Sequence, residues 1–175
     1  VDVEIGDLLN VRAGSGRLLI HLAPKAKTAA GVDRSQAMRM LARSRVQQAG
    51  LAKCTLRNVE CNTLPFRSHS FDTVLLNEAL SRAVDRRQAL AEASRVVRPD
   101  GRVLILDWVQ PVALQNKTIS SSSEQGEAPL AENHLRALLA EQGLTIRQRS
   151  WLPGKSPNYA LFVAMPHSAL QTGAA

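Results

Sequence analysis

Two glycines and an acidic residue have the spacing of a nucleotide-binding site. Gly14 and Gly16 separate two apolar stretches, and Asp33 ends a third stretch, seventeen residues after Gly16. Glycines between a strand and a helix allow backbone N–H groups to approach a ligand, with the positive end of the helix dipole behind them. A carboxylate at the end of the following strand accepts hydrogen bonds from ribose hydroxyls. These residues therefore predict a pocket for an adenosine group.

The elements that would position this pocket alternate between strand and helix. Short and nearly continuous apolar runs predict strands at residues 7–11, 29–33, 54–59, 72–77 and 103–108. Helices are predicted at residues 16–23, after Ser35 and after Asp85. Ser and Asp are preferred N-caps, and Pro24 cannot continue a helix. The helix after Ser35 is expected to end at Gly50 and to bury an apolar face made of Met38, Leu41, Ala42 and Val46.

The C-terminal part of the chain has a different pattern. A helix carrying Leu135, Leu138 and Leu139 is expected to end at Gly143. Two last strands, at residues 145–151 and 159–165, flank a short connection at 153–157 that contains Gly and Pro. Such a connection is typical of a hairpin, so this strand pair should be antiparallel. In the turn at residues 98–101, Gly101 is expected to adopt a positive φ.

This order of elements predicts an α/β fold. We expect a Rossmann-like three-layer sandwich, with a mostly parallel seven-stranded sheet and an antiparallel C-terminal hairpin. The 175 residues suit one domain, spanning residues 1–175. Residues 110–129 lack periodicity and are expected to form a flexible loop, and residues 166–175 a frayed tail.

Composition argues against a membrane protein and a metal site, and it leaves open a surface that binds RNA or an acidic partner. No apolar run approaches the roughly 20 residues that span a bilayer, and no signal peptide is visible, so a cytoplasmic location without a membrane partner is expected. Cys54 and Cys61 are the only cysteines and match no common zinc spacing, so no metal site is predicted. The net charge is +7, and the basic cluster is either a surface for RNA or an acidic partner, or a solvated helix face. Its members are Arg34, Arg39, Arg43, Arg45, Lys53 and Arg57.

Four segments in this order resemble the class I S-adenosylmethionine-dependent methyltransferases, especially the ubiquinone/menaquinone-biosynthesis branch. They are the turn at residues 10–16, the segment 31–38 with its strand-ending acid, the Glu-Cys-Asn-Thr-Leu-Pro-Phe run at 60–66 followed by Phe-Asp at 71–72, and the segment 93–105. The resemblance implies S-adenosyl-L-methionine as cofactor and methyl transfer to an acceptor, with a small molecule expected first. A nicotinamide-dependent oxidoreductase shares the glycine turn, but the Leu-Pro-Phe run and the hairpin argue against it.

The resemblance also implies residue roles. Gly14 and Gly16 would lie against the methionyl part of the cofactor, and Asp33 would hold the ribose. Glu60 would approach the adenine amino group, with the backbone of Cys61 beside it. The remaining positions implied for cofactor binding are Asn10, Arg12, Arg34, Met38 and Asn77, although Met38 also suits a helix core.

Glu78 is the candidate catalytic residue. It follows a predicted strand at the edge where ligands collect, and it would act as a general base if the acceptor needs deprotonation. The alternative is an ordinary acid at the start of a helix. The four histidines are scattered, and no catalytic triad is expected.

Two positions depart from the family pattern. Asn10 stands where the family has an acid, and Arg12 stands where it has a glycine. A positive φ at Arg12 would cost on the order of 1 kcal/mol, and its cation would repel a sulfonium. The alternative function is therefore a non-catalytic binding or regulatory module with a weakened cofactor turn, contacting RNA or a protein through the basic cluster.

Overall fold

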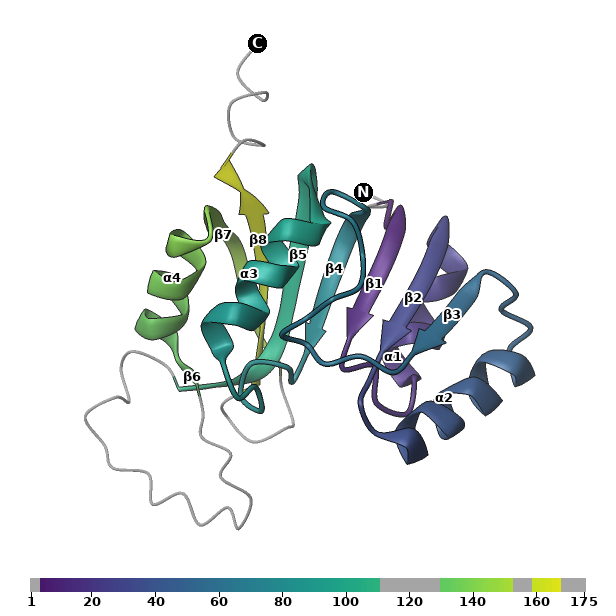
Figure 1. Ribbon diagram of the computed structural model, residues 1–175. Helices are drawn as coiled ribbons and strands as arrows, with labels where there is room; N and C mark the ends of the chain where they lie inside the picture. The colour runs from purple at the N-terminus through teal and green to yellow at the C-terminus, as the bar shows by residue number, and fades with distance from the viewer. Residues whose placement is uncertain (1–3, 111–129, 153–158, 168–175) are drawn as a thin grey trace.

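A single twisted sheet organises the computed structural model, which describes residues 4–110, 130–152 and 159–167 (Figure 1). The strand order is β3-β2-β1-β4-β5-β8-β7, and a short strand, β6, pairs with β5 off this path. The strands are β1 Asp7–Val11, β2 Thr28–Val32, β3 Cys54–Arg57, β4 Phe71–Asn77, β5 Val97–Gln110, β6 Leu130–Ala131, β7 Leu144–Trp151 and β8 Tyr159–Pro166. Of the predicted loop at 110–129 and the predicted tail at 166–175, only Gln110, Pro166 and His167 are described; Gln110 ends β5 and Pro166 ends β8, so each strand runs one residue into the segment expected to be irregular. The connection at 153–157 lies outside the described residues.

Strand directions confirm the predicted topology. Strands β1 to β5 pair in parallel, while β8 is antiparallel to both β5 and β7. Parallel neighbours need crossover connections, and the helices after β1, β2 and β4 lie in such connections, whereas α4 (Glu132–Glu141) leads from β6 to β7, which pairs with β8 alone among the described strands. The carboxyl ends of β1, β2 and β4 therefore meet at one edge of the sheet.

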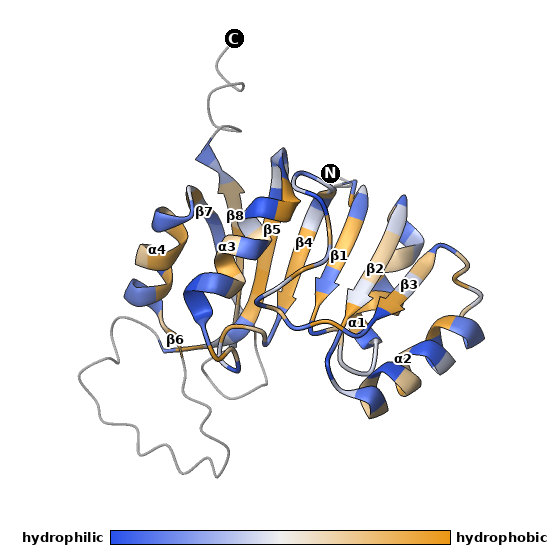
Figure 2. Ribbon diagram, viewed as in Figure 1, coloured by the Kyte–Doolittle hydropathy of each residue, from blue (hydrophilic) through white to orange (hydrophobic). Residues whose placement is uncertain are grey.

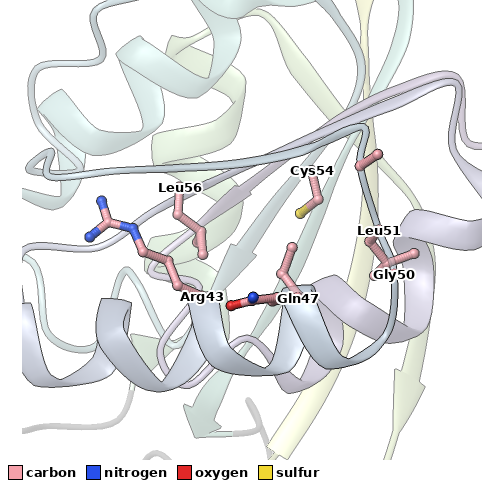
Figure 3. Close-up of a pocket in the computed structure, with 8 residues that line it drawn as sticks. Arg43, Gln47, Gly50, Leu51, Cys54 and Leu56 are labelled. Atoms are coloured by element: carbon pink, nitrogen blue, oxygen red, sulfur yellow. The ribbon is translucent and has the colours of Figure 1, made fainter.

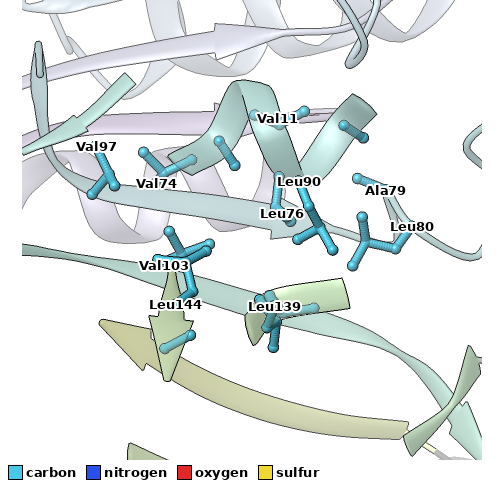
Figure 4. Packing of buried hydrophobic residues seen from close by; sticks show 14 of the residues in the cluster. Val11, Val74, Leu76, Ala79, Leu80, Leu90, Val97, Val103, Leu139 and Leu144 are labelled. Atoms are coloured by element: carbon cyan, nitrogen blue, oxygen red, sulfur yellow. The ribbon is translucent and has the colours of Figure 1, made fainter. Parts of the chain in front are cut away.

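Helices cover both faces of the sheet and give the predicted three layers. Leu19 of helix α1 and Val46 of helix α2 pack against the face that carries Leu8. On the other face, α3 and α4 bury Leu90 and Leu139 together with residues of β1, β4 and β5 (Figure 4). Hydropathy follows this layering, since the strands are mainly apolar and the helices carry polar outer faces (Figure 2). The helices are α1 Arg17–Leu22, the short 3-10 helix η1 Ala23–Lys25, α2 Gln36–Gln48, α3 Arg86–Val96 and α4 Glu132–Glu141.

Both predicted N-caps are confirmed. The Ser35 hydroxyl accepts a hydrogen bond from the backbone N–H of Met38, and the Asp85 carboxylate accepts one from Gln88. Each satisfies one of the backbone donors that a helix start leaves unpaired. These caps fix where α2 and α3 begin; α2 starts directly after the end of β2, and α3 starts after the segment that follows β4.

Local predictions were wrong in two places. In the predicted apolar face of α2, Leu41 is 48% exposed and Met38 is 36% exposed, because α2 packs at the rim of the sheet and buries only Ala42 and Arg39. Gly101 does not have a positive φ. It is small for another reason: a Cβ there would lie 2.7 Å from the backbone oxygen of Asp72, where β5 bulges out of register with β4.

Among the described residues, no helix has the length and apolarity required to cross a membrane.

Candidate active site

A cavity of about 790 Å³ opens at the carboxyl ends of β1, β2 and β4. It is the place where ligands of open α/β sheets bind. Its wall includes nine of the predicted site residues, brought from four separate segments of chain: Arg12, Gly14, Asp33, Arg34, Met38, Glu60, Cys61, Asn77 and Glu78. Asn10 and Gly16, the other two predicted positions, are not part of the wall.

The turn after β1 contributes Gly14 to the wall of this cavity. Gly14 has φ 55°, and no atom lies within 4 Å of where its Cβ would stand. Its N–H donates to the Asp33 carboxylate at 2.8 Å. Gly16 has φ 79° and serves a different purpose, because a Cβ there would lie 2.9 Å from Cβ of Ala42. Gly14 therefore faces ligand space, whereas Gly16 allows α1 and α2 to approach each other.

Asp33 is the most firmly held polar residue of the cavity. Its side chain is 5% exposed. One carboxylate oxygen accepts from Gly14, and the other accepts from the N–H of Ser35 at 2.8 Å. An ionised carboxylate has about four acceptor positions, so capacity remains for ligand donors. The charged form is satisfied by backbone N–H groups before any ligand arrives.

Two members of the basic cluster, Arg39 and Arg45, are built into the fold beside the cavity, while Arg34, Arg43, Lys53 and Arg57 are exposed. Arg39 is buried and donates to the Asp33 carbonyl and to Asn58. Arg45 donates to the carbonyl of Ser15, behind the glycine turn. Arg57 lies over the ring of Phe66 at 5.2 Å. Arg39 and Arg45 support the turn and the strand ends. Their contacts therefore give them a structural role in place of a role in binding a partner.

A second group of residues flanks Asp33 across the loop after β3. Glu60 pairs with Arg34 at 3.3 Å, and both side chains are more than half exposed. The Cys61 thiol is half-buried, and burial together with the nearby Glu60 raises its pKa. Met38 is 36% exposed at the cavity rim, so it belongs to the wall and not to the core.

The loop that carries these residues is clamped from α3. The Glu92 carboxylate accepts from the N–H of Leu64 at 2.6 Å, and Arg95 donates to the carbonyls of Leu64 and Phe66. Glu92 also pairs with Arg95 at 2.7 Å, and this hydrogen bond holds the pKa of Glu92 below its usual range. The Leu-Pro-Phe run therefore has a structural anchor that fixes the wall beside Glu60.

Arg12 and Glu78 face each other across the turn and the end of β4. Both have a left-handed backbone, with φ 55° and φ 50°. The Arg12 guanidinium donates to the backbone carbonyl of Glu78, and the Asn77 side chain donates to the carbonyl of Arg12 at 3.4 Å. The positive φ at Arg12 is the conformation in which a side chain is costly, as the sequence comparison with a glycine position suggested.

Asn10 lies beneath this turn and is fully buried. Neither its side-chain oxygen nor its nitrogen has a hydrogen-bond partner. Because buried amides are normally paired, these two atoms mark a place where a partner is needed. Their position, one residue before the end of β1, connects this need to the cofactor turn.

Sequence reasoning missed three residues near the end of β4, namely Tyr159, Arg82 and Asp107, of which only Arg82 is part of the cavity wall. The Tyr159 hydroxyl donates to the Glu78 carboxylate at 3.3 Å, and Arg82 lies 3.8 Å from the other carboxylate oxygen. Burial and the neighbouring Glu78 raise the pKa of Tyr159. Asp107 is fully buried and accepts from the N–H groups of Leu80 and Ser81, and burial raises its pKa. A lone acid in the apolar run 103–109 and the single tyrosine of the chain were the available signals.

A smaller hollow of about 430 Å³ lies between α2 and the edge strand β3 (Figure 3). Its wall is formed by apolar side chains such as Leu51 and Leu56 with Arg43 and Gln47 at the rim. Cys54 contributes a thiol to this wall, and burial raises the pKa of that thiol. It holds no carboxylate and no strand-end backbone donors, so the cavity around Asp33 is the candidate site. Within the described part of the chain, no cluster of three metal-ligating side chains occurs.

Comparison with known proteins agrees with this geometry. Residues 9–105, which include the glycine turn, Asp33 and the Leu-Pro-Phe loop, match the family described as methyltransferase domain. A ubiquinone/menaquinone biosynthesis C-methyltransferase, UbiE from Geobacter sulfurreducens, is 34% identical over 122 residues, which cover 67% of this chain and 48% of that protein. The chain thus spans about half the length of the curated relatives it matches.

Solved structures share the fold at lower identity. YcgJ from Bacillus subtilis has a TM-score of 0.74 and 23% identity, covering 85% of this chain and 67% of that one. SpnF, described as a [4+2]-cyclase, has a TM-score of 0.79 and 18% identity, covering 95% and 76%. Fold likeness at such identity therefore does not assign a reaction. The family match over more than half of the chain, on the segments that build the cavity, places this protein in the methyltransferase domain family.

Proposed function

We propose that the chain is an S-adenosylmethionine-dependent methyltransferase with a small-molecule acceptor. The observation that carries the proposal is the Asp33 carboxylate, buried at a strand end and held by backbone N–H groups of two helix-start segments. This is the arrangement that holds a ribose in α/β nucleotide sites. The cavity of about 790 Å³ lies in the range of small-molecule sites.

The residues present fit the adenosine part of S-adenosylmethionine. Asp33 retains acceptor capacity for two ribose hydroxyls, and the rim residue Met38 offers an apolar surface for a base. Glu60 is exposed in the wall on the same side, where it is able to accept from an adenine amino group. The open face of Gly14 leaves room for close approach of the methionyl part.

The fit on the methionyl side is mixed but consistent with binding. Asn10 has two unpaired buried atoms beneath the turn and an amide oxygen in place of the family's acid, but it is fully buried and outside the cavity wall, so it does not face the ammonium group in this structure. The Arg12 guanidinium points to the Glu78 carbonyl, which engages part of its donor capacity. We expect weaker binding than in a relative with an acid and a glycine at these two positions.

When bound, the cofactor supplies a methyl group already activated by a sulfonium. The task of the protein is then to place the acceptor in line with it and to exclude competing water. Asn77 and Glu78 stand at the acceptor end, and Glu78 is the residue in reach to take up a proton from a hydroxyl or acidic carbon of the acceptor. Its carboxylate is one-third exposed and accessible from the cavity.

A small molecule is the acceptor class that the observations favour. The names of the relatives describe C-methylation in ubiquinone and menaquinone biosynthesis. For this chain, C-methylation of a small molecule is a proposal. A non-catalytic module that binds RNA or protein through the basic cluster is not proposed, because Arg39, Arg45 and Arg57 make internal contacts. A cytoplasmic location stays a prediction.

Calorimetric titration with S-adenosylmethionine and S-adenosylhomocysteine tests the proposal. The expected result is saturable binding of one ligand per chain, abolished or strongly weakened in Asp33→Ala. Asp100→Ala, an exposed acid in the segment before the paired part of β5, is the matched control and should bind as the wild type does. Absence of binding to the wild type at millimolar ligand would reject the proposal.

A further inference from the structure

Two strained residues meet where the cofactor turn touches the acceptor end of the cavity. A left-handed backbone at a non-glycine residue costs on the order of 1–2 kcal/mol, and such strain persists only where surrounding contacts impose it. Arg12 and Glu78 both have it, and they are joined by a hydrogen bond. Among the described residues only His69 shares this feature, and it lies at the other end of β4.

The contacts that impose the conformation on Glu78 come from two different elements. Its N–H donates to the carbonyl of Leu106 in β5 at 2.7 Å, while its carbonyl accepts from the Arg12 guanidinium. The Asn77 side chain returns a contact to the carbonyl of Arg12 at 3.4 Å. The peptide groups on both sides of Cα of Glu78 are therefore held, and the direction of its side chain is determined.

That direction places the Glu78 carboxylate between two partners. Tyr159, at the start of β8, donates to one oxygen at 3.3 Å, and Arg82 lies 3.8 Å from the other. Glu78 and Asp107 raise the pKa of the Tyr159 phenol, and Arg82 lowers it. The Arg12 guanidinium is directed to the backbone carbonyl of Glu78.

We propose that Arg12 is a positioning residue for Glu78, joining the cofactor turn to the end of β4 and presenting the Glu78 carboxylate to Tyr159 and to the acceptor. The inference rests on the proposed function, in which Glu78 takes up the proton of the acceptor. Where the family has a glycine, Arg12 thus forms a hydrogen bond that links the cofactor turn to the end of β4. A movement of the cofactor turn would then also move Glu78, the proposed base.

Tyr159 provides the readout, because it is the only tyrosine in the chain. Phenolate absorbance near 295 nm in the apo protein therefore reports this one residue without cofactor or acceptor. In the wild type, Tyr159 should titrate above its ordinary value, and Glu78→Gln should lower that pKa by removing the negative neighbour. Incorporation of fluorotyrosine brings the titration to lower pH, away from alkaline unfolding.

The decisive variant is Arg12→Gly. Glycine suits the left-handed backbone at this position, so the substitution relieves strain while removing the guanidinium. Loss of a nearby cation alone would raise the pKa of a phenol, since the cation favours phenolate. The proposal predicts the opposite sign: the pKa of Tyr159 should fall toward its value in Glu78→Gln, because Glu78 is no longer held in place.

Two further variants complete the test. Arg12→Lys, which keeps a charged donor, should restore part of the wild-type titration. Arg43→Ala removes a cation from α2, outside the cavity wall, and should leave Tyr159 unchanged. An unchanged or raised pKa in Arg12→Gly, or no effect of Glu78→Gln, would overturn the proposal. Failure of cofactor binding would instead reject the proposed function, and calorimetry measures it separately.

Discussion

The two ends of the cavity are built in different ways. At the adenosine end, Asp33 accepts from the backbone N–H groups of Gly14 and Ser35, and the loop beside it is clamped by Glu92 and Arg95. At the acceptor end, Arg12 and Glu78 adopt left-handed conformations and hold each other through side-chain to backbone contacts. The first end is formed without strained non-glycine residues, whereas the second has two residues in a strained backbone conformation, at the place where we propose that the acceptor binds.

The difference teaches where this chain follows its family and where it departs. Backbone donors arranged around a carboxylate suit any adenosine ligand, so that end tolerates little change. One fold serves many reactions by changes in the side chains of its site, and we propose that Arg12, Glu78 and Tyr159 are such side chains in this chain. The following substitutions separate the two ends by what each one impairs.

The largest effect is expected from Asp33→Ala at the adenosine end. It removes a ribose acceptor and leaves the N–H groups of Gly14 and Ser35 without their partner. Hydrogen bonds to charged groups contribute about 1.5–3 kcal/mol, so cofactor affinity should fall on the order of 10- to 100-fold. Calorimetry measures the change, and wild-type affinity in the variant would contradict the role of Asp33.

Glu92→Gln tests the clamp behind the same end. The carboxylate accepts from Leu64 and Arg95, and the free energy of unfolding should fall by about 1–3 kcal/mol at neutral pH. The folded pKa of Glu92 is lowered by Arg95, so its stabilising contribution is present above the ordinary value of 4.5 and is lost as pH falls through the folded pKa. Urea unfolding at several pH values should show the two proteins converging in acid. A difference that persists or grows there would contradict the assignment.

Gly14→Ala and Gly16→Ala should have separable effects. Alanine at Gly16 meets Ala42 at 2.9 Å and has an unfavourable φ, so unfolding free energy should fall by about 1–2 kcal/mol or more. Alanine at Gly14 has the same backbone penalty but no neighbour within 4 Å, and its methyl group occupies ligand space. We therefore expect the larger loss of stability in Gly16→Ala and the larger loss of cofactor affinity in Gly14→Ala, measured by thermal unfolding and calorimetry. The reverse order would place the ligand elsewhere.

The smallest effect is expected from restoring the family pattern in the double variant Asn10→Asp, Arg12→Gly. An acid beneath the turn and the loss of a nearby cation should strengthen cofactor binding by about fivefold, equal to roughly 1 kcal/mol. In the same protein, the pKa of Tyr159 should fall, because Arg12 no longer holds Glu78. Stronger cofactor binding together with this lower pKa would show that the two ends of the cavity respond differently. Weaker binding would mean that Arg12 contributes to the cofactor site.

Much of this architecture was predictable because local signals agreed with the fold. The apolar runs, the Ser35 and Asp85 caps and the hairpin pattern each indicate an element by short-range physics. The adenosine end was predictable for the same reason, since Gly14 and Asp33 lie at fixed spacing along the chain. The exposure of Leu41 was not, because helical spacing does not show how far a helix extends past the sheet.

The acceptor end was only partly predictable. Glu78 was found from its place after a strand, but Tyr159 lies 81 residues further along the chain, and only antiparallel pairing of β8 with β5 brings it close. The hydrogen bonds of Arg39 and Arg45 to backbone carbonyls were also not predictable. The sequence shows the charge of an arginine but not whether its side chain is solvated or binds a carbonyl oxygen. Tertiary contacts decide both points.

A crystal structure of the chain with S-adenosylhomocysteine tests the central claim most directly, because it shows both ends of the cavity at once. The account predicts the ribose hydroxyls on the Asp33 carboxylate, the adenine beside Glu60 and Met38, and the Arg12 guanidinium still on the carbonyl of Glu78. A ligand in the hollow beside Cys54, or a ribose without contact to Asp33, would contradict it.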